Sequence, residues 1–196
     1  MAINYTQTDG SANACPGEDG YCATTGNNIS GTSERDATDG GTAGSTPVSS
    51  GAFSSSATDQ RASIITIVPD TGTSGDSGTW TVRLNITTAN MNLSIIAIDI
   101  CRVNSSCVNQ ESIGSATGLS ISLGTTGVKS QNVTGSAVTL AAGDKVVIVF
   151  HVANGAMSGQ SFAWTPDQNI DSPFNAAAAE KTPYSHWRQT GPTVAM

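Results

Sequence analysis

The stretch TWTVRLNI, residues 79–86, decides the fold class of this chain of 196 residues. Apolar side chains occupy its even positions, from Trp80 to Ile86, and polar side chains occupy the odd positions between them. Successive side chains of a β-strand point to opposite faces, so a period of two predicts a strand that is buried on one face. Such a strand needs several partner strands to bury that face.

Further strand candidates follow, separated by Gly- and Ser-rich turns at intervals of about 8–12 residues. They are residues 62–68, 94–103, 108–113, 119–123, 128–134, 145–152 and 160–165. Residues 145–152 are apolar at both alternating positions, which indicates a central strand covered on both faces. The pattern therefore predicts an all-β fold, with a single jelly-roll-like β-sandwich domain over residues 61–172.

Residues 1–60 contain no sustained apolar period and are rich in Ser, Thr, Gly, Asn and Asp. Such a segment buries too little apolar surface to order itself. Two interpretations follow: a disordered segment, or an extended N-terminal arm that is ordered by lying on neighbouring subunits. We favour the arm, with four isolated apolar side chains as its candidate anchors. These anchors are Tyr5, Tyr21, Ile29 and Phe53.

Residues 173–196 form a second segment outside the predicted sandwich. It contains Tyr184 and Trp187 close together, and leaving both exposed would create an apolar patch. We therefore expect a C-terminal tail that packs on a surface through these two anchors.

Charge and hydropathy exclude two classes of partner. Charged residues make up 12 % of the chain, and fifteen acids against eight bases give a net charge of −7. Nucleic-acid binding depends on Lys and Arg, so we expect no nucleic-acid partner. No run approaches the roughly 18 apolar residues of a membrane span, so we expect no membrane partner. The first residues also lack the basic and apolar regions of a signal peptide, which argues against Sec-dependent secretion unless the chain is a processed product.

Two short motifs match protease signatures, and we interpret both as turns. Gly75–Gly78 reads GDSG, the core of the trypsin-like nucleophile motif, but both histidines, His151 and His186, come after Ser77. A trypsin-like order places the base first. Asp70–Gly72 reads DTG, the aspartic-protease triplet, which needs a second carboxylate from a dimer partner.

Metal ligation has little support in the sequence. The four cysteines lack zinc-knuckle spacing, and two scattered histidines do not complete a site. A loop calcium site using Asp70 with Asp76, or Glu18 with Asp19, is the alternative, because hard cations accept such oxygens. Acidic turns without a metal are common, so we expect no cofactor.

The cysteines suggest two local disulfides. A short loop at residues 103–105 would place Cys101 opposite Cys107 in a hairpin, within disulfide range. Cys15 and Cys22 would then close a small loop in the arm. The alternative is four reduced thiols, as expected if the protein stays in a cytosol.

The aromatic residues Trp80, Phe162 and Trp164 permit two interpretations. They could form a sugar-binding platform, but their phase matches the apolar face of their strands. We therefore expect them to pack in the core.

Residues 79–174 resemble structural proteins of tailed bacteriophages. The resemblance is carried by five motifs, WTVRLN (80–85), CRVNSS (101–106), GLSISLG (118–124), AGDKVVIVF (142–150) and NIDSP (169–173). The layout with a polar arm is also similar to that of capsid decoration, or cement, proteins.

This resemblance implies a virion structural protein and no catalytic residues, so we expect no enzyme activity. It implies a location on the outer capsid surface after assembly in the host cytoplasm, with the major capsid protein and further copies of the chain, as a homotrimer, as partners. The arms would cross capsomer boundaries and stabilise the shell. The alternatives are a phage receptor-binding or fibre module, a carbohydrate-binding module using Trp80 or Trp164, and a protease using Asp70 or Ser77.

Overall fold

Thirteen β-strands build the part of the chain that the computed structural model describes, which is residues 2–15, 22, 27–28, 34–53, 59–155 and 158–176. Six longer strands come from the middle of the chain: β5 (Gln60–Ile67), β6 (Gly78–Thr88), β7 (Leu93–Val103), β8 (Asn109–Ala116), β10 (Gly127–Gly135) and β11 (Lys145–Asn154). Three come from nearer the ends of the chain: β1 (Ala2–Gln7), β3 (Glu34–Asp39) and β13 (Asn169–Asn175). Four are short: β2 (Asn27–Asn28), β4 (Val48–Ser49), β9 (Ile121–Ser122) and β12 (Ala163–Thr165).

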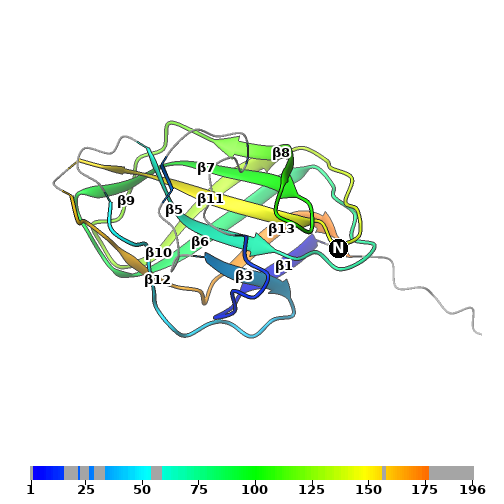
Figure 1. Ribbon diagram of the computed structural model, residues 1–196, viewed down its shortest axis with the longest axis horizontal. Coiled ribbons are helices and arrows are strands. Elements are labelled where there is room, and N and C mark those ends of the chain that lie inside the picture. Colours follow the sequence, from blue (N-terminus) through cyan, green and yellow to red (C-terminus); the bar gives the residue numbers. More distant parts are fainter. Residues whose placement is uncertain are drawn as a thin grey trace, which may run out of the picture.

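These strands close into a barrel. The hydrogen-bonded order is β10-β8-β7-β11-β5-β3-β1-β13-β6. The last strand, β6, also pairs with the first, β10, over nine residue pairs from Gly127–Ile86 to Gly135–Gly78, which closes the ring. The ring therefore holds nine strands, mostly antiparallel, with a parallel pairing between β3 and β5. The front wall of β7, β11 and β5 and the rear wall of β6 and β10 are visible in Figure 1.

The prediction of an all-β fold is confirmed, but the prediction of a jelly-roll-like β-sandwich is wrong. A sandwich has two separate sheets with free edges. Here β10 bonds to both β8 and β6, and β1 bonds to both β3 and β13, so both sides of the ring are joined. The physical reason is the N-terminal segment, which supplies the two strands that bridge β5 to β13.

The predicted N-terminal arm is accordingly wrong for its described part. β1 alternates exposed and buried residues, and Tyr5 and Phe53 are 0 % and 1 % exposed within the chain's own core. Sparse apolar residues suffice because each one fills a gap in a core that the other strands already build. Tyr21 and Ile29 lie outside the described residues.

The boundary predicted at residue 173 is also crossed by a strand. β13 runs on to Asn175, and Phe174 is fully buried with its ring edge-on to Trp80, 4.8 Å between centroids. The other two anchors, Tyr184 and Trp187, lie outside the described residues.

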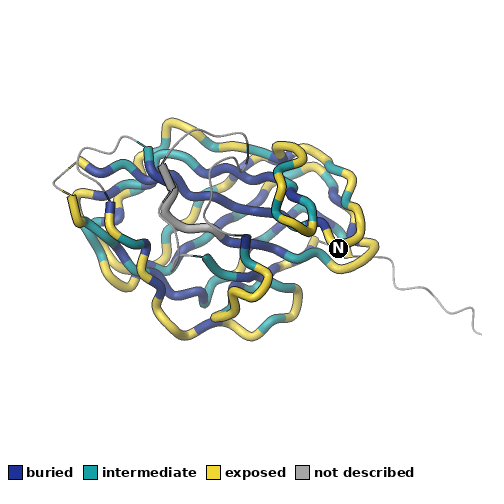
Figure 2. Tube along the Cα trace, viewed as in Figure 1, coloured by how far each residue is buried: buried dark blue, intermediate teal, exposed yellow. Residues whose placement is uncertain are grey.

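The predicted central strand is confirmed as β11, which pairs with β5 and β7 and is buried on both faces. Its inward residues, such as Ile148 and Phe150, join the main core of the barrel. Its outward residues, Val147 and Val149, belong to a second apolar cluster on the outside of the barrel. Buried positions follow the strands, whereas exposed positions gather in the loops at both ends (Figure 2).

Candidate functional site

The second apolar cluster, which we call the outer cluster, is built around two disulfides. It contains Val103, Val147, Val149 and all four cysteines. The bonds are Cys15–Cys107 and Cys22–Cys101, with Cα–Cα distances of 5.5 and 5.0 Å. Both fasten the N-terminal segment to β7 and the turn after it.

All four cysteines are paired in the structure, but not with the partners that the sequence suggested: the predicted local pairing is wrong. The hairpin turns later than predicted: Val103 pairs with Asn109, and Cys101 therefore pairs with Ser112 on β8 in place of Cys107. Cys107 sits in the turn itself, where its amide donates to the carbonyl of Asn104 and its backbone has a φ of 63°. This turn presents Cys107 to the N-terminal segment.

A buried histidine lies on the same outer face. The Nδ1 of His151 is 2.7 Å from Oδ1 of Asp59, and its Nε2 is 3.0 Å from Oδ2 of Asp99. His151 and Asp99 are buried, whereas Asp59 is partly exposed. The pairings of β11 with both β5 and β7 shift register beside His151, so bulges flank this position on either side.

This arrangement favours the protonated form of the imidazole. Burial alone lowers the pKa of His151, but the contacts with the carboxylates of Asp99 and Asp59 outweigh it, and the net pKa is raised above its usual value. The sequence offered only a weak signal for this site, namely a histidine and an aspartate inside two otherwise apolar strands.

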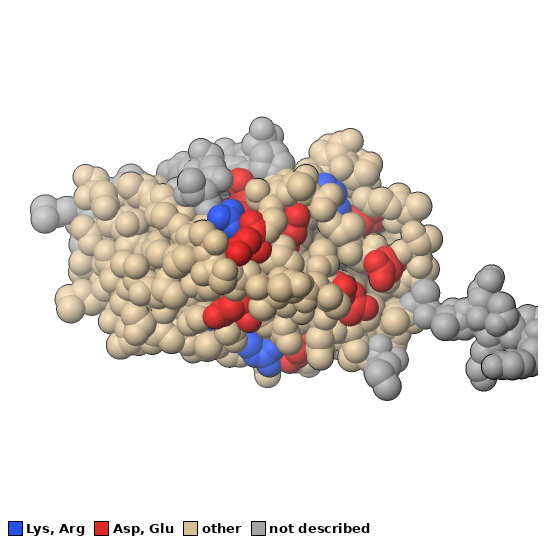
Figure 3. Space-filling view, turned by 90° about the horizontal axis from the view of Figure 1, so that it is seen from below, with Lys and Arg blue, Asp and Glu red and all other residues tan. Residues whose placement is uncertain are grey.

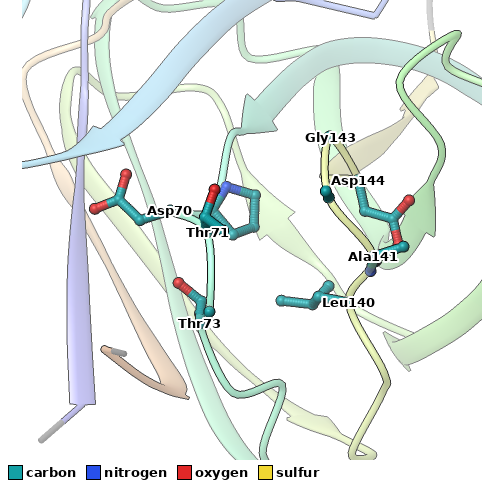
Figure 4. A pocket seen from close by; sticks show the side chains of 10 residues that line it. Asp70, Thr71, Thr73, Leu140, Ala141, Gly143 and Asp144 are labelled. Atoms are coloured by element: carbon teal, nitrogen blue, oxygen red, sulfur yellow. Dashed lines mark hydrogen bonds between the residues drawn. The ribbon is translucent and has the colours of Figure 1, made fainter. Parts of the chain in front are cut away.

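A crevice of about 240 Å³ opens at one end of the barrel. One wall is residues 69–73 and the other is residues 140–144. Figure 4 shows the side chain of Leu140 projecting from the second wall toward the first, and the carboxylates of Asp70 and Asp144 directed apart. Asp144 is held by the backbone N–H of Ala141 at 2.8 Å and by Arg102 at 3.4 Å. The crevice therefore brings no pair of carboxylates together.

The protease motifs lie in turns. Ser77 is exposed in the loop before β6, and both ring nitrogens of His151 already face carboxylates, so neither is available to take a serine proton. Asp70 lies in the crevice wall, and the other carboxylate of the crevice, that of Asp144, is directed away from it in Figure 4.

The described residues do not form the calcium-binding cluster that the sequence suggested as an alternative. Asp76 accepts hydrogen bonds from Ser74 Oγ at 2.6 Å and from Asn175 Nδ2, which lower the pKa of its carboxyl. The residues that the structure describes contain no group of three or more potential metal ligands. Glu18 and Asp19 lie outside the described residues.

The aromatic residues are core residues, as predicted. Trp80, Phe162 and Trp164 are each at most 1 % exposed. They are therefore unable to stack on a sugar without unfolding the barrel, and the carbohydrate platform is wrong.

A shallow polar depression of about 370 Å³ lies over β6 and the approach to β13. It is lined by Arg83, residues 167–169 and Asp171. Arg83 pairs with Asp171 at 2.7 Å and donates to the carbonyl of Asn169 at 2.9 Å. Figure 3 shows several separate acidic and basic groups on one face of the molecule, most of which is uncharged.

The described part of the chain contains no apolar helix of bilayer-spanning length. No protein-family model matches the chain, and no curated protein matches it in sequence. In fold it is similar to a CocE/NonD family hydrolase from Staphylococcus aureus, with a TM-score of 0.52 and 8 % identity. The match covers 89 % of this chain but 36 % of the hydrolase chain, so this chain spans about a third of that protein's length. At this identity the likeness concerns the fold alone.

Proposed function

We propose that this chain is a structural protein of a tailed-phage virion that decorates the outer surface of the capsid. Its partners are the major capsid protein and, in a homotrimer, two further copies of itself. The resemblance of residues 79–174 to phage structural proteins supports the class of function. The overall acidity supports an outer location, because DNA inside the shell repels a negative surface.

The observation that carries the proposal is the pair of disulfides in the outer cluster. They join positions 92 and 79 residues apart and tie the N-terminal segment to the barrel. Disulfides that close long loops restrict the unfolded chain and persist in oxidising media. A virion surface protein meets such a medium when the cell lyses, whereas a protein confined to the cytosol gains nothing from these bonds.

The structure changes the mechanism expected from the sequence. In its described part, the N-terminal segment fills its own barrel, so decoration by this chain works through the outer faces of a rigid domain. Each subunit then acts as a clamp whose shape is fixed before it binds. Clamping several capsid subunits through repeated weak contacts raises the effective concentration of each contact.

The test uses particles from lysates of cells that carry the gene. Antibodies against the purified chain are expected to label the shell in immunogold micrographs, and a mild-denaturant wash is expected to remove the chain and lower the temperature at which the particles release DNA. Adding the purified oxidised protein back restores that temperature. Shells that carry no label, or that are equally stable after complete removal of the chain, contradict the proposal.

A second candidate is a receptor-binding or fibre module, which the polar depression around Arg83 favours. Carboxylate, amide and guanidinium groups in one shallow site suit hydrogen bonding to sugar hydroxyls. This candidate predicts label at the tail tip, and binding of purified protein to host cells that is lost in Arg83→Ala and kept in Lys129→Ala. Label on the shell with no cell binding excludes it.

A further inference from the structure

The two disulfides of the outer cluster have different surroundings. Cys22 and Cys101 are both buried, at 7 % and 0 % exposed. In the other bond Cys15 is fully buried, but Cys107 is partly exposed because it lies in a surface turn. A dissolved thiol therefore meets less cover at Cys107, whereas the Cys22–Cys101 bond is buried at both ends.

A lysine lies next to the accessible sulfur. The Nζ of Lys145, the first residue of β11, is 3.7 Å from Sγ of Cys107. It also donates a hydrogen bond of 2.9 Å to the carbonyl of Asn13, two residues before Cys15. These two contacts hold the ammonium group beside the Cys15–Cys107 bond, one from the turn that carries Cys107 and one from the segment that carries Cys15.

This charge matters for the chemistry of exchange. A thiolate attacks a disulfide through a transition state in which three sulfurs share a net negative charge. A cation beside them stabilises that state, and it also stabilises the thiolates that form. In the described structure Lys145 is placed to do both for Cys15–Cys107.

We propose that Cys15–Cys107 is a thiol–disulfide exchange site for a dithiol reductant, and that Cys22–Cys101 is a closed structural bond. The first thiolate of the dithiol attacks Sγ of Cys107, forms a mixed disulfide and displaces Cys15 as a thiolate. The second thiolate of the reductant then attacks the reductant's own bonded sulfur and displaces Cys107. The protein gains two electrons and two protons, and the dithiol leaves as its disulfide. This exchange chemistry is independent of the proposed function.

The test follows each cysteine in the full-length oxidised protein. The protein is incubated with dithiothreitol, quenched with acid at intervals, alkylated and examined by peptide mass spectrometry. Cys15 and Cys107 are expected to become alkylated together, about tenfold faster than Cys22 and Cys101, because thiol access limits the second bond. Opening of both bonds at one rate, or of Cys22–Cys101 first, overturns the assignment.

The role of Lys145 is tested by removing its charge, since its two contacts predict opposite changes in the rate of exchange. Lys145→Gln is expected to slow the first phase by about two- to fivefold through the lost charge. If Lys145 acted only through its hydrogen bond to Asn13, the same substitution would loosen the segment that carries Cys15 and speed the reaction. Lys145→Arg retains the fast phase, and Lys129→Gln, at a surface lysine bonded to Thr125, is the matched control. A Lys145→Gln rate equal to or above that of the control overturns the role, provided circular dichroism shows both oxidised variants folded.

Discussion

The Nε2 of His151 lies 3.0 Å from the carboxylate of Asp99, so a buried imidazole on β11 is joined to a buried acid on β7. The other ring nitrogen contacts Asp59, which directly precedes β5. One side chain thus ties three neighbouring elements together on the outer face of the barrel. The link is strongest when the ring carries its proton, because the charged ring then faces a carboxylate at each nitrogen and its Nδ1 donates to Asp59.

Replacing His151 with Gln is expected to destabilise the fold more at pH 6 than at pH 9. The raised pKa in the folded state means that the stabilisation is complete below the unfolded pKa of about 6.5 and is lost as the pH rises through the folded pKa. At pH 6 we expect a cost of about 1–3 kcal/mol, as for other hydrogen bonds to charged groups. Denaturant unfolding at the two pH values measures the difference.

The control for this experiment is Asp59→Asn, which retains the shape and removes one negative charge from a partly exposed site. It is expected to show the same pH trend with a smaller amplitude. An equal cost of His151→Gln at both pH values would show that the imidazole packs there as a neutral group.

Deleting residues 2–7 is expected to abolish cooperative unfolding of the barrel. The deletion removes β1, which pairs with β3 and β13, and leaves both with unpaired edges. It also removes the fully buried ring of Tyr5, whose loss alone costs about 3–5 kcal/mol by comparison with other aromatic truncations. Thermal unfolding followed by circular dichroism tests this, and a deletion variant with an unchanged melting temperature would restore the arm hypothesis.

Tyr5→Phe is the matched substitution for that deletion. The Tyr5 hydroxyl is buried and has no hydrogen-bond partner in the described structure, and burial together with the charges of Asp39 and Asp70 raises its pKa. Removing an unpartnered hydroxyl is expected to leave the free energy of unfolding unchanged, or to increase it by up to about 1 kcal/mol. A loss of stability in Tyr5→Phe would reveal a partner for this hydroxyl.

Gly114→Ala is expected to weaken the closure of the barrel. β8 and β10 pair at Gly114 and Gly135, and a Cβ on Gly114 would lie 2.4 Å from the carbonyl oxygen of Thr134. Since that oxygen belongs to the backbone, relief requires the strands to separate, at about 1–3 kcal/mol. Chemical denaturation of this variant beside Ser115→Ala, an exposed neighbour, measures the cost, and equal stabilities would show that the two strands move apart freely.

The sequence predicts the strands of this fold better than their connections. The alternation in β6 and the double burial of β11 are both confirmed. A strand shows which of its faces are buried directly, because apolar residues occupy every second position or every position along it. The contribution of β1 is invisible in the sequence, because two or three apolar residues order only against a core that is built elsewhere. The predicted disulfide pairing was wrong for another reason: the hairpin turns later than residues 103–105, so that Val103 pairs with Asn109 and Cys101 with Ser112.

The environment of the tryptophans gives a last prediction. Trp80 and Trp164 are both fully buried, and Trp187 lies outside the described residues. In a Trp187→Phe variant the remaining emission is therefore expected at short wavelength, with little quenching by iodide or acrylamide, because the indoles are surrounded by apolar side chains. Unfolding in guanidinium chloride should shift the emission to long wavelength and make it fully quenchable, which serves as the internal control. Quenching in the folded variant, or a shift on adding soluble glycans, would mean that an indole reaches the surface and would return the carbohydrate-binding hypothesis to consideration.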